Sequence, residues 1–104
     1  MSRFPKDPKL ILTANAYQAD DGFKIWAAHH VENNKPLILE QHGGHYGIGL
    51  LNQTEDHQLK IADKFASWGW KSKEYSNVVP MPALKLNSGE VKYNKSGNIL
   101  MTTA

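Results

Sequence analysis

The chain has 104 residues and a formal net charge of +2, from 12 basic and 10 acidic side chains. This length allows one domain at most, and the absence of long charge runs argues against a nucleic-acid-binding protein or a polybasic membrane patch. Because the chain has no cysteine, disulfides, thiolate metal ligands and cysteine nucleophiles are excluded. The absence of disulfides is consistent with a protein of a reducing compartment. No apolar run approaches the ~20 residues of a transmembrane segment, so we expect a cytoplasmic protein, peripheral to the inner face of the membrane at most.

The first part of the chain has the pattern of a strand, a helix and a second strand. Lys9–Ala14 contains the apolar run Leu-Ile-Leu, which predicts a short strand buried on both faces of a parallel sheet. Asp20 and Asp21 suit the first turn of a helix, because carboxylates cap and stabilise a helix N-terminus, and Pro36 stops that helix. Leu37–Glu40 is the second predicted strand. This βαβ pattern predicts an α/β fold with a Rossmann-like parallel sheet.

Polar turns follow both predicted strands. Asn15 lies in the turn after the first strand, and residues 41–49 form a loop after the second strand with four glycines, two histidines and a tyrosine. The carboxyl ends of parallel strands meet at the same edge of a sheet, where α/β proteins bind ligands, so we expect these two loops to converge. The alternative for Asn15 is the more common role of a turn or capping asparagine.

The second part of the chain is less regular. Residues 52–62 predict a helix in which Thr54 and His57 lack the Glu or Gln of a full capping box. Residues 65–70 predict a strand that would place Trp68 and Trp70 on one face. An extended element at residues 78–82 follows, then a polar connection and a final apolar strand within residues 98–104. A parallel strand normally leads into a helix, so we expect this sequence to be a segment of a longer protein.

The glycine-rich loop has the composition of an acid–base site. Histidine, with an ordinary pKa near about 6.5, suits proton transfer at neutral pH, and His42 is placed to take a proton from an acceptor hydroxyl. The neighbouring glycine amides suit an anionic leaving group, although residues 44–49 match neither the dinucleotide nor the P-loop phosphate fingerprint. We expect substrate contacts from the polar residues and glycines around His42, namely Asn15, Gly43, Gly44, His45, Tyr46, Glu55, Asp56 and His57.

Two other interpretations of this loop compete with the acid–base site. The glycines could form a structural turn without chemistry, although a histidine on each side of the glycine pair makes that less favoured. His42, His45, His57 and Asp56 could instead supply zinc ligands. The helical His-Glu-x-x-His pattern is absent and a glycine loop fixes no ligand geometry, so we expect no metal and no other cofactor.

Six ordered blocks of sequence resemble the central part of the transferases of bacterial surface-carbohydrate biosynthesis. These blocks are Thr-Ala-Asn-Ala-Tyr (13–17), Asp-Asp-x-Phe-Lys-x-Trp-Ala-Ala (20–28), Gln-His-Gly-Gly-x-Tyr-Gly (41–47), Thr-Glu-Asp-His (54–57), Ser-Trp-Gly-Trp (67–70) and Asn-Val-Val-Pro (77–80). The resemblance implies a two-domain glycosyltransferase B-type architecture. Residues 1–84 would then end the N-terminal Rossmann-like domain and its interdomain region, and residues 85–104 would be a linker and the first strand of a truncated C-terminal domain.

The resemblance also implies substrates and a mechanism. Such a transferase uses a nucleotide-activated sugar and a carbohydrate acceptor, and most of its donor-binding half would lie in the remainder of the chain, beyond Ala104, so the isolated segment should be inactive. The motif at residues 41–43 is similar to the His-Gly motif of glycerophosphotransferases and capsule-type sugar transferases, where the histidine is considered a catalytic base; here that residue is His42. Gly44 stands where those enzymes have threonine. The alternative hypothesis is a small, non-catalytic α/β binding module.

Overall fold

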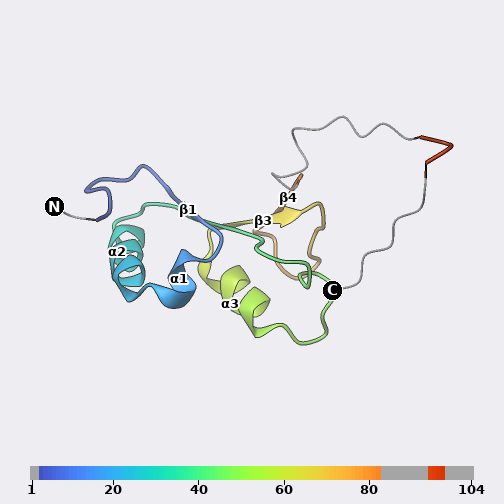
Figure 1. Cartoon of the computed structure of the whole chain (residues 1–104). Helices are drawn as coiled ribbons and strands as arrows, with labels where there is room; N and C mark the ends of the chain where they lie inside the picture. Colours follow the sequence, from blue (N-terminus) through green and yellow to red (C-terminus); the bar gives the residue numbers. More distant parts are fainter. Residues whose placement is uncertain (1–2, 83–93, 98–104) are drawn as a thin grey trace.

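The computed structural model describes residues 3–82 and 94–97, and these residues form an α/β unit (Figure 1). Its elements in chain order are β1 (Ile11–Thr13), α1 (Ala16–Ala19), α2 (Asp21–Glu32), β2 (Leu37–Glu40), α3 (Gln53–Ile61), β3 (Lys64–Trp68) and β4 (Val78–Met81). The predicted strand–helix–strand pattern is confirmed, and the predicted helix at residues 52–62 corresponds to α3. Helix α1 is an addition, because the sequence analysis interpreted its residues as part of a polar turn.

The four strands form one parallel sheet in the order β1-β2-β3-β4. Thr13 of β1 lies opposite Leu39 of β2, and Glu40 of β2 lies opposite Ala66 of β3. Right-handed crossovers that advance in one direction place their helices on the same face of a sheet, and Figure 1 shows α1, α2 and α3 on one side of the strands. The predicted parallel sheet is therefore confirmed.

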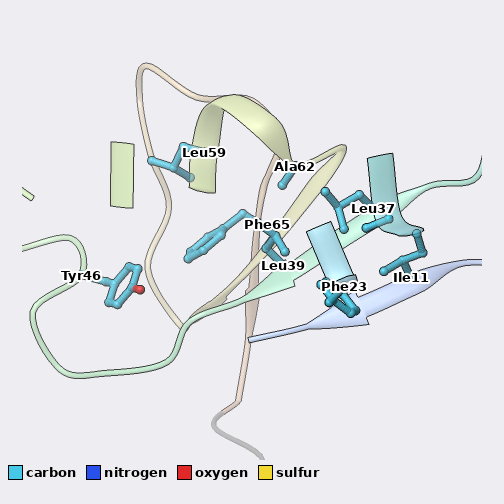
Figure 2. Packing of buried hydrophobic residues seen from close by; sticks show 9 residues of the cluster. Ile11, Phe23, Leu37, Leu39, Tyr46, Leu59, Ala62 and Phe65 are labelled. Carbon is cyan, nitrogen blue, oxygen red and sulfur yellow. The ribbon is translucent and has the colours of Figure 1, made fainter. Parts of the chain in front are cut away.

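The hydrophobic core lies between the helices and this face of the sheet. Leu39 and Phe65 are fully buried at the centre of the sheet, and Phe23 of α2 and Leu59 of α3 belong to the same cluster (Figure 2). Tyr46 joins the core from the glycine-rich loop, with its ring stacked against Phe65 at a centroid distance of 5.8 Å. The loop is thereby attached to the core through one aromatic side chain.

The opposite face of the sheet is not covered by any helix of the described residues. Leu12, Trp68 and Met81 on this face are 58%, 42% and 44% exposed, and they line an apolar hollow of about 220 Å³ with Ile38 and Ala66. The prediction that the first strand is buried on both faces is therefore wrong for the described part of the chain. The reason is topological: both helical crossovers lie on the core face, and the β3–β4 connection contains no helix.

The helix starts show which side chains act as caps. Asp20 caps α2 by accepting a hydrogen bond from the Phe23 amide at 3.0 Å, as the sequence analysis expected. Helix α3 is capped by Asn52, whose Oδ1 accepts from the Glu55 amide at 3.1 Å. Asn52 is therefore the N-cap of α3, which suits its type because asparagine caps helices well, and Thr54, which lacks a capping-box partner, lies inside the first turn.

The chain turns sharply at the end of β3. The strand ends at Trp68, and Gly69 adopts a φ of 92°, a conformation that glycine reaches without a steric penalty. Trp70 consequently returns to the core face, where its ring lies 5.9 Å from that of Phe65, whereas Trp68 stays on the uncovered face. The prediction that the two tryptophans share a face is therefore wrong.

The extended element predicted at residues 78–82 corresponds to β4. Pro80, which has no N–H to donate, is tolerated there because β4 is an edge strand of the described sheet. The strand predicted within residues 98–104 and most of the predicted linker lie outside the described residues. Within the residues that are described, no helix is long and apolar enough to cross a membrane.

Candidate functional site

The loops that follow β1 and β2 meet at the carboxyl edge of the sheet. Asn15 lies two residues beyond the end of β1, and His42 lies two residues beyond the end of β2. The parallel register, with Thr13 opposite Leu39, brings the ends of the two strands to the same edge, and the Asn15 Nδ2 atom is 3.0 Å from the His42 Nε2 atom. The predicted convergence of the two loops is confirmed.

Asn15 occupies the N-cap position of α1 but does not cap the helix with its side chain. The Thr13 hydroxyl takes over this role by accepting a hydrogen bond from the Ala16 amide at 3.1 Å. The interpretation of Asn15 as a capping asparagine is therefore wrong for its side chain. Its amide lies next to His42 instead, although Asn15 is not among the residues that line the cavity described below.

A cavity of about 500 Å³ lies beside His42, a volume typical of sites for small molecules. Its walls come from the glycine-rich loop, α1 and the start of α3, and its lining residues are Gln18, His42, Gly43, His45, Tyr46, Gly49, Leu51, Asn52 and Thr54. The structure therefore brings four of the predicted site residues, His42, Gly43, His45 and Tyr46, around one cavity. Polar and apolar groups are mixed along its wall, as in sites that orient a ligand by a few hydrogen bonds.

The beginning of the glycine-rich loop is tied to the end of β3 by Gln41. The Gln41 side chain is buried, and its Nε2 donates to the Gly43 carbonyl at 2.6 Å. Its Oε1 accepts from the Trp68 amide and from the Trp70 indole N–H, both at 2.8 Å. Because all of these bonds are formed by one buried side chain, Gln41 fixes the position at which the backbone enters the loop and passes His42.

The far end of the loop is held by Glu55 and by a close approach of the backbone to a tryptophan. Glu55 Oε2 accepts from the Gly47 amide at 3.0 Å. Gly47 has a φ of 77°, and a Cβ atom there would lie 3.1 Å from the Trp70 ring, so this position requires glycine. Glu55 does not line the cavity; its role among the predicted contacts is to hold the loop.

Tyr46 is the buried tyrosine among the residues that line the cavity. Burial raises the pKa of Tyr46, and the charge of Glu55 adds to this, whereas hydrogen bonds from the Gln58 side chain and the His42 backbone oppose it. Gln58 itself is fully buried and its Nε2 donates to the Ala14 carbonyl at 3.2 Å. The Tyr46 hydroxyl is therefore protonated at neutral pH and can both donate and accept a hydrogen bond.

Residues 1–104 match the family model described as LIC12162 family transferase. The chain belongs to the LIC12162 family. No curated protein and no solved structure matches the chain. A transferase moves a group from a donor to an acceptor, so a LIC12162 family chain requires a cavity for at least one substrate, and the cavity beside His42 has the volume and polar groups for this purpose.

The remaining predicted residues of this LIC12162 family chain lie outside the main cavity. His57 lines a neighbouring cavity of about 370 Å³ with Tyr17, Lys24 and Gln53, and the two cavities share Gln18 and Thr54. Asp56 and Gly44 line neither of these cavities. Among the described residues, no group of three or more His, Asp or Glu side chains is arranged to hold a metal ion.

Sequence reasoning missed several residues that line the cavity beside His42. Gln18 was missed because it lies on α1, a helix of four residues that is too short to give a hydrophobic period. Asn52 and Thr54 were considered only as helix-start residues. The sequence did contain a signal for Asn52. A residue that caps the N-terminus of α3 lies where the glycine-rich loop ends, and therefore next to the cavity that this loop lines.

Proposed function

We propose that this chain is the acceptor-side part of a glycosyltransferase that builds surface polysaccharide from a nucleotide-activated sugar. Family membership supports group transfer, and the sequence resemblance supports the sugar substrates. The observation that carries the proposal is the position of His42, which lines the 500 Å³ cavity and is held at the carboxyl edge of the sheet by its contact with Asn15. In this proposal a second Rossmann-like domain of the complete protein binds most of the donor.

In the proposed reaction His42 acts as the general base. It accepts the proton of an acceptor hydroxyl while the oxygen attacks the donor carbon, and the nucleoside diphosphate leaves with the electron pair of the broken bond. In this proposal the neutral Tyr46 hydroxyl orients the sugar by a hydrogen bond, which its position among the cavity-lining residues supports. Gln41 and Glu55 contribute indirectly, because they hold the two ends of the loop that carries His42.

The test is to replace His42 by alanine in the complete protein that contains this sequence. Candidate nucleotide sugars are first screened for binding by calorimetry, and turnover is then measured with those that bind. We expect His42→Ala to lower kcat by about 10²-fold or more, the usual scale of general acid–base catalysis. His29→Ala is the matched control, because His29 is an exposed histidine on α2 that lines neither cavity. Turnover of His42→Ala near that of the control would contradict the base assignment, and failure of all nucleotide sugars to bind would favour a non-catalytic module.

A further inference from the structure

The glycine-rich loop ends in a short aliphatic tip, residues 48–51, which lies just before α3 (Figure 1). Ile48, Leu50 and Leu51 are 78%, 102% and 96% exposed, more than any other large hydrophobic side chain of the described residues. Single exposed aliphatic residues are common on protein surfaces, whereas a contiguous group of them marks an interaction surface. We therefore expect a partner outside the described residues to cover the tip.

The backbone on either side of the tip is held by Glu55. Glu55 Oε2 accepts a hydrogen bond from the Gly47 amide at 3.0 Å, before the tip, and from Asn52 Nδ2 at 3.4 Å, after it. Asn52 Oδ1 accepts in return from the Glu55 amide at 3.1 Å. Within the loop, the Gly49 amide donates to the His45 carbonyl at 3.2 Å. The aliphatic side chains are therefore exposed on a closed turn that is fixed at both ends.

We propose that the tip inserts into the interface of a lipid bilayer and docks the protein on a membrane. A stable protein–protein interface uses about 20–30 residues from each partner, and its strongest contacts are enriched in Trp, Tyr and Arg. The tip has four residues and none of these types. A bilayer requires no complementary shape, and binding to it scales with the apolar area that is buried. Charge does not oppose this contact, because the chain carries a net charge of +2 and anionic lipids attract cationic groups.

Docking through the tip brings the cavity beside His42 to the lipid surface, because Leu51 belongs both to the tip and to the cavity wall. An acceptor that is itself held in the membrane can then reach His42 without leaving the bilayer. This consequence for the acceptor rests on the proposed function, whereas the docking does not.

Flotation of the 104-residue chain with vesicles of phosphatidylethanolamine and phosphatidylglycerol measures the docking. We expect the double variant Ile48→Ser/Leu50→Ser to bind about tenfold more weakly than wild type, because two aliphatic side chains no longer enter the apolar phase. Leu51 is left unchanged because it lines the cavity. The matched control is Leu12→Ser/Ile25→Ser, which replaces one leucine and one isoleucine that are 58% and 73% exposed on β1 and α2. Equal weakening by the two double variants, or no binding of wild type, would overturn the proposal.

A second measurement locates the part of the chain that enters the lipid. Because the chain has no cysteine, Leu50→Cys provides a single thiol for an environment-sensitive fluorophore, and Ile25→Cys provides the control on α2. We expect the vesicles to raise the emission from position 50 and shift it to shorter wavelength, and to leave the emission from position 25 unchanged. An equal response at the two positions would overturn the proposal.

Two further results separate this proposal from its alternatives. If the wild-type chain self-associates without binding vesicles, and Ile48→Ser/Leu50→Ser is monomeric in sedimentation, the tip is a contact between two copies of the chain and the membrane proposal is overturned. If His42→Ala has normal turnover in the complete protein, the proposed function fails, but vesicle binding still decides whether the tip docks on a membrane.

Discussion

Tyr46 belongs both to the core and to the candidate site. Its ring stacks on Phe65, and the same residue lines the cavity beside His42. Because the side chain is buried, ionisation of its hydroxyl would place a charge in an apolar environment, and this is the main cause of its raised pKa. The stability of the fold and the chemistry of the site are therefore linked through one hydroxyl group.

We predict that Tyr46 makes the fold sensitive to alkaline pH. The folded-state pKa of Tyr46 lies above the unfolded value of about 10, so its contribution is complete below about pH 10 and is lost as pH rises through the folded pKa. Urea unfolding between about pH 9 and pH 11 should show a smaller loss of stability for Tyr46→Phe than for wild type. Tyr75→Phe, at a partly buried tyrosine on the β3–β4 connection, is the control. Equal losses in Tyr46→Phe and wild type would contradict the prediction.

Gly47 is the position of the glycine-rich loop that depends most on the absence of a side chain. Its φ of 77° disfavours alanine, and so does the Trp70 ring, which lies 3.1 Å from the place that a Cβ atom would occupy. We predict that Gly47→Ala lowers the free energy of unfolding by about 1–3 kcal/mol. Gly44→Ala is the matched control, because a Cβ there meets nothing within 4 Å, and its effect should stay within about 0.5 kcal/mol. The free energies of unfolding of both variants are measured by denaturant unfolding. Equal effects would mean that neither the positive φ nor the Trp70 ring restricts position 47 to glycine.

At the scale of elements, the start of α3 can be tested directly. Asn52 Oδ1 accepts from the Glu55 amide, whereas Thr54 lies in the first turn of the helix. We predict that Asn52→Ala lowers the free energy of unfolding by about 1 kcal/mol and that Thr54→Ala changes it by less than about 0.5 kcal/mol. A larger effect of Thr54→Ala than of Asn52→Ala in denaturant unfolding would contradict the assignment of Asn52 as the cap.

The elements differ in how far local sequence determines them. Short apolar runs were sufficient to predict β1 and β2, and the carboxylates before α2 were sufficient to predict its start, because these signals act within a few residues. The role of Gln41 could not be predicted, since its partners Trp68 and Trp70 are 27 and 29 residues away. The position of Trp70 depends on the turn at Gly69, which a strand pattern does not reveal.

The candidate site was predictable in part for the same reason. Parallel strands bring their carboxyl ends to one edge, so the meeting of Asn15 and His42 follows from topology alone. The part of the cavity wall that comes from α1 and α3 could not be predicted from topology, because it depends on how these helices pack against the sheet. His57 and Asp56 are neighbours in sequence to Glu55, yet within the described residues only Glu55 of the three accepts a hydrogen bond from the loop. Successive residues of a helix point in directions that differ by about 100°. Which of these three side chains faces the loop could not be predicted without knowing the residue at which α3 begins.

At the scale of the whole molecule, the two faces of the sheet should respond differently to substitution. Leu39 is fully buried on the core face, whereas Leu12 is 58% exposed on the opposite face. We predict that Leu39→Ala lowers the free energy of unfolding by about 2–5 kcal/mol, and that Leu12→Thr changes it by less than about 1 kcal/mol. Comparable losses for the two variants in denaturant unfolding of the 104-residue chain would mean that the face carrying Leu12 is covered in solution.

The strand order has a consequence for the way this sheet is built during translation. Within the described sheet, each strand after β1 pairs with the strand that was synthesised immediately before it, so none of these four strands is inserted between two others that formed earlier. The β1–β2 pair with α2 can therefore form as soon as Glu40 has left the ribosome, and β3 and β4 can then add at the growing edge. An N-terminal nascent chain should become protected from protease in steps, one strand at a time.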